Sequence, residues 1–475
     1  MAINPEEFGA SFQDFMDQMR AQKKPAEAPF FVRKLQEHFG MEPASLPVVS
    51  ELLPRHNQAN LHLAMEAYVA GEGRSAELLG VVGLHGFTGK GLSDLVTARG
   101  GFAGEAKEGP VEYTNVTLDE DRVLACVESG VFLIRDDAER LVVFIRDEAK
   151  IGSWKHLAVE VMARDRATAE RFLSWLREAM RARSVYRGHV ISLSAGYPEL
   201  TVKFHRLPAI DRQAIILPEG LLERIERQTI GFGRQGHRLR QARRHLKRGL
   251  LLHGPPGTGK TLTIMYLANS MPDRTVLIVT VKGLGLISHT CAMARTLQPS
   301  IVILEDVDLI AEERTKRGKG SATPLLFELL NEMDGLSDDV DVLFLLTTNR
   351  PDLLEPALAA RPGRVDQAIE IPVPDETCRR RLFEFYGRGL TLEVADLDRF
   401  LKRTEGASPA FIRELLRRAA LVAADSSDGE LCVADRHLDV ALHELVVQGG
   451  ELTKSLLGFR SRIGFGSSDR SSNPE

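Results

Sequence analysis

The segment GPPGTGKT, residues 254–261, constrains this chain more than any other, because it lies directly between an apolar run and a helical pattern. A loop that binds phosphate needs glycines, since backbone N–H groups must turn toward the phosphates and a side chain would block their approach. Lys260 is expected to reach the β- and γ-phosphates and Thr261 to hold Mg²⁺, while the N-terminus of the following helix adds partial positive charge. The alternative is a chance glycine-rich turn, which the flanking strand and helix disfavour. The residues predicted to bind the nucleotide are Gly254, Pro255, Pro256, Gly257, Thr258, Gly259, Lys260, Thr261 and Leu262.

Two acidic residues end a second apolar strand, SIVILEDVD, and such strand ends face the ligand in parallel sheets. One carboxylate is expected to orient Mg²⁺, for which we predict Glu305, and its neighbour Asp306 to polarise the attacking water. Asn349 ends a third apolar strand, VLFLLTTN, where it can bind the γ-phosphate or align that water. The alternatives are two acids at an exposed strand end, and an Asn that caps a helix or forms a turn.

Arg361 and Arg364 flank a Pro-Gly turn in the segment EPALAARPGRVD. An arginine on a tight turn can present its guanidinium to a phosphate. If it lies far from the phosphate loop of its own chain, it can act on the nucleotide of another subunit. Both are therefore catalytic candidates at the nucleotide of a neighbouring subunit. For an isolated RPGR, a surface salt bridge is the simpler interpretation.

Apolar strands alternate with helices over residues 201–373, a pattern that predicts an α/β fold with a parallel sheet covered by helices on both faces. Helical spacing then takes over and predicts a helical lid over residues 374–450. The earlier helical and β-type runs predict an N-terminal α+β domain, residues 29–200, with no catalytic motif. Residues 1–28 are predicted to form a mobile arm, and the Ser- and Gly-rich residues 451–475 a disordered tail.

Composition restricts the class of protein. Hydrophobic residues make up 43% and charged residues 27% of the 475-residue chain, which is typical of folded globular proteins. The 61 Lys and Arg against 66 Asp and Glu leave a net charge of −5, which argues against global attraction to nucleic acid or to an anionic membrane. No apolar run is long enough to span a bilayer and the N-terminus has no signal-like pattern, so we expect a cytoplasmic protein with no membrane partner. The four cysteines are scattered and are predicted to be reduced packing residues.

Several segments together resemble the AAA family of ATPases within the broad AAA+ class. They are RGLLLHGPPGTGKT, SIVILEDVDLI, LLNEMDGL, LTTNRPDLLEPAL and RPGRVD, in that order, and the resemblance covers about residues 213–424. It implies a P-loop ATPase that binds ATP and Mg²⁺ between the protomers of a hexameric ring. The resemblance also implies roles for a Walker A loop (residues 254–261), a Walker B pair (Glu305 and Asp306), sensor 1 (Asn349), arginine fingers (Arg361 and Arg364), an inter-subunit signalling segment (Met333, Asp334 and Gly335) and the sensor 2 start of the lid (residues 404–412).

The chain departs from the family pattern at three places. The usual Walker B pair is Asp-Glu, whereas this chain has Glu305-Asp306, and the shorter Asp306 must lie closer to the water or work through an altered geometry. The segment before the RPGR motif is one residue longer than the common form, which leaves open whether Arg361 or Arg364 reaches across. Residues 282–287, KGLGLI, lack the aromatic side chain with which many family members grip polypeptide in the pore, so threading is only weakly indicated.

Basic residues gather in two segments. Residues 233–248, GRQGHRLRQARRHLKR, contain no aromatic residue for base stacking and directly precede the strand that leads into the phosphate loop. They indicate a solvated or inter-subunit helix face more strongly than a nucleic-acid site, and we expect their charge to lie beside the triphosphate or the pore. Residues 313–320, ERTKRGKG, form either a second pore loop or a solvated loop.

These observations predict an ATP hydrolase that forms a homo-oligomeric ring and remodels, disassembles or translocates a protein substrate or complex. Residues 1–200 are then expected to recognise that substrate. Two alternatives stay open, namely a nucleotide-gated assembly or scaffold protein with slow hydrolysis and a nucleic-acid remodelling ATPase.

Overall fold

The computed structural model describes residues 28–83, 91–97, 106–119, 122–137, 139–148, 156–196, 199–244, 246, 248–308, 325–334, 340–352, 354, 366–425 and 431–448. The chain divides into two compact units, one comprising Met1–Val185 with Tyr197–Leu200 and the other Tyr186–Gly196 with Thr201–Glu475. The predicted arm lies outside the described residues apart from Ala28, and the predicted tail lies outside them entirely.

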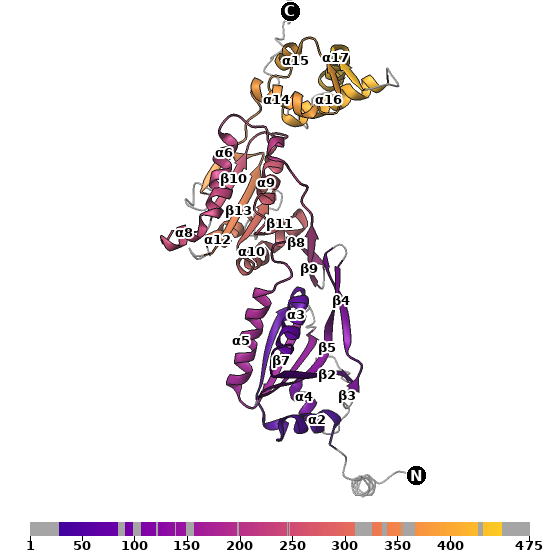
Figure 1. Cartoon of the computed structure of the whole chain (residues 1–475), viewed down its shortest axis with the longest axis vertical. Helices are drawn as coiled ribbons and strands as arrows, with labels where there is room; N and C mark the ends of the chain where they lie inside the picture. Colours follow the sequence, from indigo (N-terminus) through magenta and orange to yellow (C-terminus); the bar gives the residue numbers. More distant parts are fainter. Residues whose placement is uncertain are drawn as a thin grey trace, which may run out of the picture. The chain divides into compact units, whose positions relative to one another are not determined.

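The first unit is built on a seven-stranded antiparallel sheet. Its strands are β1 (Val48–Pro54), β2 (Arg74–Val82), β3 (Lys107–Gly109), β4 (Glu112–Asp119), β5 (Arg122–Asp136), β6 (Glu139–Glu148) and β7 (His156–Ala163). Their order across the sheet is β1-β7-β6-β5-β2-β3, and β4 pairs with β5 (Figure 1). The alternating and continuous β-type runs of the sequence therefore do form strands here.

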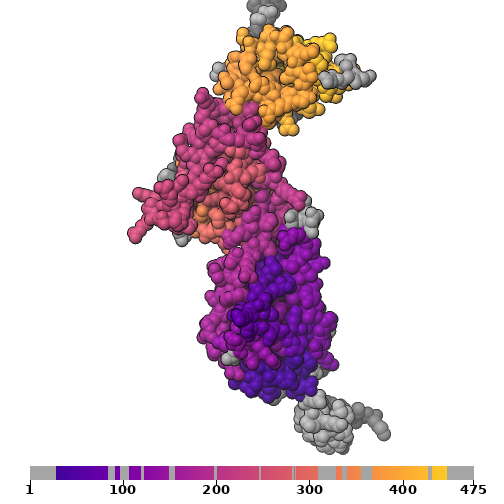
Figure 2. Space-filling view, in the orientation of Figure 1, coloured from indigo at the N-terminus to yellow at the C-terminus, as the bar shows by residue number. Residues whose placement is uncertain are grey.

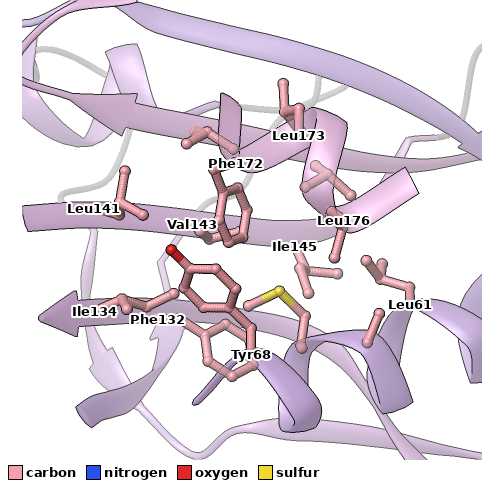
Figure 3. Close-up of a cluster of buried hydrophobic side chains, with 14 of the residues drawn as sticks. Leu61, Tyr68, Phe132, Ile134, Leu141, Val143, Ile145, Phe172, Leu173 and Leu176 are labelled. Carbon is pink, nitrogen blue, oxygen red and sulfur yellow. The ribbon is translucent and has the colours of Figure 1, made fainter. Parts of the chain in front are cut away.

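Helices pack on both faces of this sheet, namely α2 (Phe30–Phe39), α3 (Gln58–Val69), α4 (Leu92–Thr97) and α5 (Arg166–Ala182). Successive residues of β6 point to opposite faces, as strand geometry requires. Val143 belongs to the cluster that includes side chains of α3 and α5, whereas Phe144 belongs to the cluster that includes α2 and α4. Figure 3 shows the first cluster, with Tyr68 and Phe172 packed together over the strands. The unit is α+β, as predicted.

The second unit contains a seven-stranded sheet of mainly parallel strands. The strands are β8 (Val190–Gly196), β9 (Glu199–His205), β10 (Arg248–His253), β11 (Thr275–Val279), β12 (Ser300–Leu304), β13 (Val342–Thr348) and β14 (Gln367–Glu370). Their order is β14-β10-β13-β12-β11-β8-β9, with parallel pairing from β14 to β8. All residues of β12 and β13 are buried, so both faces of the sheet are covered, which explains their continuous apolar sequences. The predicted parallel α/β sheet is confirmed.

The helices of the second unit form two groups. The first group accompanies the sheet: α6 (Leu221–Glu226), α7 (Phe232–Arg234), α8 (Gly236–Gln241), α9 (Lys260–Asn269), α10 (Ile287–Thr296) and α12 (Leu325–Asp334). The second group has its own core: α14 (Glu376–Tyr386), α15 (Leu397–Arg403), α16 (Pro409–Ala424) and α17 (Asp435–His443). Two short strands, β15 (Thr391–Glu393) and β16 (Cys432–Ala434), pair within this predicted helical part. None of the helices in the described ranges is both long and apolar enough to cross a bilayer.

Short helical turns complete the chain. Those in 3₁₀ form are η1 (Pro43–Ser45), η2 (Arg55–Asn57), η3 (Arg212–Ala214) and η5 (Val281–Leu286), and those in π form are η4 (Arg227–Gly231) and η6 (Glu444–Gln448). The residues of KGLGLI thus fall mainly in η5, between β11 and α10.

The boundary between the two units differs from the one predicted at residue 200. Val190, Ile191 and Ser192 of β8 pair in parallel with β11, so this strand is part of the second sheet. The sequence of β8 is compatible with a strand in either unit. Only the identity of the strand to which it is hydrogen-bonded shows that it belongs to the second unit. The predicted boundary was therefore placed too late in the chain.

Candidate nucleotide-binding site

The glycine-rich loop connects β10 to α9, and its neighbours exclude side chains at two glycines. Gly254 has a φ of 142°, and a Cβ there would lie 2.2 Å from the carbonyl oxygen of Ile371. Gly257 has a φ of 74°, and its Cβ would lie 2.8 Å from Ser408 Oγ. The loop is thus enclosed by the backbone that follows β14 and by the start of α16.

Lys260 is the first residue of α9, and its ammonium group is held inside the loop. Nζ donates to the carbonyl oxygens of Gly254 at 3.0 Å and Pro255 at 2.8 Å. Burial lowers the pKa of Lys260 to about 8, although the negative charges of Asp306 and Asp308 act in the opposite direction. At neutral pH the group is mainly protonated and can bind a phosphate, but a modest rise in pH removes its charge.

We expect nucleotide affinity to fall as the pH rises above the Lys260 pKa of about 8. Below this pKa the ammonium is already charged, whereas above it the free protein must take up a proton to bind phosphate. Linkage then weakens binding by up to about tenfold for each further pH unit. Titration with a fluorescent ATP analogue from neutral to alkaline pH measures this, and Lys260→Arg is the control because guanidinium stays charged throughout. A constant affinity of the native protein over this range would contradict the lowered pKa.

The ends of β12 and β13 bring Asp306 and Asn349 into contact, as expected for adjacent parallel strands. Asn349 Nδ2 donates to Asp306 Oδ1 at 3.0 Å, and the backbone N–H of Asp306 donates to Thr347 Oγ1 at 2.9 Å. Asp306 has a φ of 48°, in the left-handed region, where Asp and Asn are more common than most other side chains. The hydrogen bond from Asn349 thus fixes one of the two carboxylate oxygens of Asp306, and the other oxygen is not held by this contact.

Asp308 lies outside the predicted set, yet it holds Asn349 in place. Its Oδ1 accepts hydrogen bonds from Thr348 Oγ1 at 2.8 Å and from the backbone N–H of Asn349 at 3.2 Å. The residue is buried, and its carboxylate therefore needs these donors. The signal in the sequence that could have identified it is the third acid of the EDVD segment.

Glu305 has the property expected of a magnesium ligand. Its Oε1 is buried and has no hydrogen-bond partner among the described residues, which is costly unless a cation or water meets it. Thr261 and Asp306 line the neighbouring cavity, although Glu305 does not. Proteins usually bind Mg²⁺ through one or two of their own oxygens, with phosphates and water as the other ligands. The side-chain oxygens of Glu305, Thr261 and Asp306 fit this requirement. No cluster of three or more His, Cys, Asp or Glu suited to a metal occurs in the described part of the chain.

A cavity of about 720 Å³ joins the loop to the ends of β12 and β13. Seven of the predicted nucleotide-binding residues, Pro256 to Leu262 in sequence, line it together with Asp306 and Asn349. Its other walls come from the segment before α6, from α9 and from the lid helices α14 and α16, and of these only the start of α16 lies within a predicted segment, residues 404–412. These additional residues are Pro208, Ile210, Ala214, Ile215, Ile216, Leu217, Thr263, Met265, Leu382, Tyr386, Pro409, Ala410, Arg413, Glu414 and Arg417.

The start of α16, within predicted residues 404–412, contacts the loop directly. Ser408 Oγ accepts a hydrogen bond from the N–H of Phe411 at 3.1 Å and so caps this helix. The backbone N–H of Ala410 donates to the carbonyl oxygen of Gly257 at 3.3 Å. Met333, predicted to signal between subunits, is buried in α12.

Several predicted functional residues lie outside the described part of the chain. They are Arg361, Arg364, Gly335 and residues 313–320. Their roles stay predictions, as does the role of Asp334, whose side chain is not described.

The basic residues 233–248 do not lie beside the nucleotide cavity of their own chain, which was the first of the two predicted positions; the second, beside a pore, stays a prediction. They precede β10 whereas the loop follows it, and an extended strand of this length separates its two ends by about 20 Å. None of the described residues of this segment lines the cavity. Closeness in sequence was misleading here because the intervening residues are fully extended.

This combination of features defines a P-loop nucleoside triphosphatase. A glycine-rich loop joins a parallel strand to a helix, and polar residues end the two strands beside it. Residues 250–373 match the model of the ATPase family associated with various cellular activities (AAA). This part of the chain belongs to the AAA family.

Comparison with curated proteins places the similarity in about two fifths of the chain. The proteasome-activating nucleotidase of Methanopyrus kandleri is 38% identical over 189 residues, which cover 37% of this chain and 43% of that protein. The 26S proteasome regulatory subunit 6B homologue of Schizosaccharomyces pombe is 36% identical over 214 residues, or 42% of this chain and 55% of that protein. The cell division cycle protein 48 homologue of Archaeoglobus fulgidus is 36% identical over 189 residues, or 37% of this chain and 25% of that protein. The chain thus spans between a quarter and just over half of these relatives.

Proposed function

We propose that this chain hydrolyses ATP within a homo-oligomeric ring and uses the energy to remodel a protein substrate. The observation that carries the proposal is the convergence of Lys260, Thr261, Asp306 and Asn349 on one cavity. Phosphoryl transfer to water needs a cation that binds the phosphates and a residue that positions the water, and this cavity offers both.

In the proposed mechanism, Lys260 exchanges its hydrogen bonds to the loop carbonyls for bonds to phosphate oxygens. Asn349 holds Asp306 Oδ1, which leaves Oδ2 to accept a hydrogen bond from the attacking water. Asp308 accepts the hydrogen bond of the Asn349 backbone and acts as a positioning residue. Thr261 and Glu305 would hold Mg²⁺, which would neutralise part of the phosphate charge.

The proposed oligomer is a hexamer, in which Arg361 or Arg364 reaches the nucleotide of the next subunit. Support comes from the AAA domain and from relatives whose names refer to the proteasome. The first unit, which has a core of its own, would recognise the protein substrate. The cytoplasm is the proposed compartment.

A second candidate is a nucleotide-gated assembly protein with slow hydrolysis. The observation that favours it is the side chain at the water position, because Asp306 is one methylene shorter than Glu and is tied to Asn349. A carboxylate further from the water catalyses more slowly. Stable oligomers with ATP and negligible turnover would support this candidate.

The test is steady-state phosphate release by purified protein at several protein concentrations, with Lys260→Ala as the blank. Activity per subunit should rise with concentration and reach a plateau, because each site is completed by a neighbour. Sedimentation velocity with ATP gives the oligomeric state in parallel. Turnover by a monomer, independent of concentration, would overturn the ring.

A further inference from the structure

Residues 233–244, which we call the arginine arm, carry a local excess of positive charge. Their exposed arginines are Arg234, Arg238, Arg240, Arg243 and Arg244. The sequence contains no acidic residue between Glu226 and Asp273, so no neighbour along the chain neutralises them. The arm includes α8, which projects from the sheet-bearing part of the unit (Figure 1, Figure 2).

These arginines are not engaged by carboxylates of the described residues. Arg238 Nη1 donates only to the neutral side chain of Gln235, at 3.2 Å. Asp341 lies near Gly236 in the arm, but Arg274 already binds it at 2.7 Å. The exposed arginines of α5, by contrast, are paired: Arg166 with Glu170 at 2.6 Å, Arg171 with Glu139 at 2.9 Å and Arg177 with Glu51 at 2.8 Å.

Arg243 adopts a backbone conformation that is uncommon for a residue with a side chain. Its φ is 54°, in the left-handed region, and its N–H donates to the carbonyl oxygen of Arg240 at 3.0 Å. The residue that follows a helix in this conformation is usually Gly or Asn, because a Cβ is unfavourable. The chain therefore carries an arginine at a position where glycine would be easier to accommodate.

Since the arm lies at the far end of β10 from the phosphate loop, its charge does not serve the chain's own nucleotide. These exposed guanidinium groups are therefore available to a partner of negative charge. Arginine guanidinium groups bind both carboxylates and phosphates with paired hydrogen bonds, so the shape and length of the partner decide between them.

We propose that the arginine arm docks a short segment of a partner protein rich in Asp and Glu. Residues 233–244 contain no Phe, Tyr or Trp for base stacking, and Phe232, directly before them, is covered by Arg248 at 4.6 Å from its ring centroid. The chain has a net charge of −5, so the rest of the molecule is still more negative once these arginines are set aside. A long polyanion such as nucleic acid would meet that negative remainder, whereas a short acidic segment contacts only the arm.

The test measures binding of a short fluorescent poly-glutamate peptide and of a fluorescent DNA duplex to the full-length protein. The peptide should bind at low salt and dissociate as salt rises. The combined variant Arg238→Glu, Arg240→Glu and Arg244→Glu should weaken peptide binding by at least about tenfold. Arg243→Gly should weaken it by about two- to fivefold without lowering thermal stability, because glycine relieves the backbone conformation.

The matched control is Arg166→Glu, Arg171→Glu and Arg177→Glu on α5, which changes the net charge by the same amount. It should leave the peptide affinity within about twofold, and ATP binding should be unchanged in both combined variants. Failure of the native protein to bind the peptide at low salt would overturn the proposal, as would an equal loss in both variants. Tighter binding of the duplex than of the peptide, lost in the arm variant, would assign the arm to nucleic acid instead. The proposal is independent of ATP hydrolysis, so loss of turnover alone leaves it standing.

Discussion

Asp306→Asn is expected to lower the rate of ATP hydrolysis by about 10²- to 10⁴-fold while ATP still binds. The change keeps the size of the side chain but removes the negative oxygen that would accept a hydrogen bond, and then a proton, from water. Lys260 and the loop backbone, which bind the phosphates, keep their own hydrogen bonds, although Lys260 loses the nearby negative charge of Asp306, a charge that raises the pKa of Lys260. Single-turnover hydrolysis and equilibrium binding of an ATP analogue separate the two effects.

Asp308→Asn is the matched control for this prediction. This variant makes the same replacement of a carboxylate by an amide two residues further along the chain. The hydrogen bonds of Asp308 go to Thr348 and to Asn349, which itself lines the cavity. We expect a smaller loss of turnover, together with some loss of thermal stability because a buried carboxylate loses one acceptor. Unchanged turnover in Asp306→Asn would show that another group positions the water, and Glu305 is the first candidate.

Gly254→Ala is expected to destabilise the second unit by about 3 kcal/mol and to abolish tight nucleotide binding. The added Cβ would meet the carbonyl oxygen of Ile371 at 2.2 Å, and the φ of 142° is unfavourable for any L side chain. Backbone at both positions must then move, and with it the loop. Differential scanning calorimetry measures this loss of stability. The transition of the second unit is recognised as the one whose midpoint rises when ATP is added to the native protein.

Two other glycines separate the causes of this effect. Gly259 has a φ of 96° with nothing within 4 Å of its Cβ position, so Gly259→Ala tests backbone conformation alone. Gly285 has nothing within 4 Å and no positive φ, so Gly285→Ala should be close to neutral. The expected order of destabilisation is Gly254, then Gly259, then Gly285. Equal stability of the Gly254 and Gly285 variants would contradict the contact with Ile371.

The parts of the site that are contiguous in sequence could be predicted. The phosphate loop depends on glycines at fixed spacing between a strand and a helix, and all of that information is local. The meeting of Asp306 with Asn349 could also be predicted, because the ends of adjacent parallel strands share one edge of the sheet. The 3.0 Å hydrogen bond between them agrees with that rule.

The remaining walls of the cavity could not be predicted, and Ile215, Ile216 and Leu217 show why. Ile215 and Leu217 pack in the core of the sheet, whereas Ile216 packs in the core of the lid helices. Three consecutive apolar residues give no indication of which core each will join. That choice depends on the lid lying against the loop, where Ala410 bonds to Gly257.

Local sequence thus specified the chemistry of this protein: the phosphate loop, the acidic strand end and the alternation of strands with helices. Tertiary packing settled the geometry, namely that β8 pairs with β11, that Asp308 supports Asn349, and that the arginine arm lies at the opposite end of β10 from the nucleotide. The physical reason is that loops and capping motifs depend on neighbours within a few residues. Strand pairing and core formation instead join residues far apart in the chain, and no short spacing encodes which partners they will find.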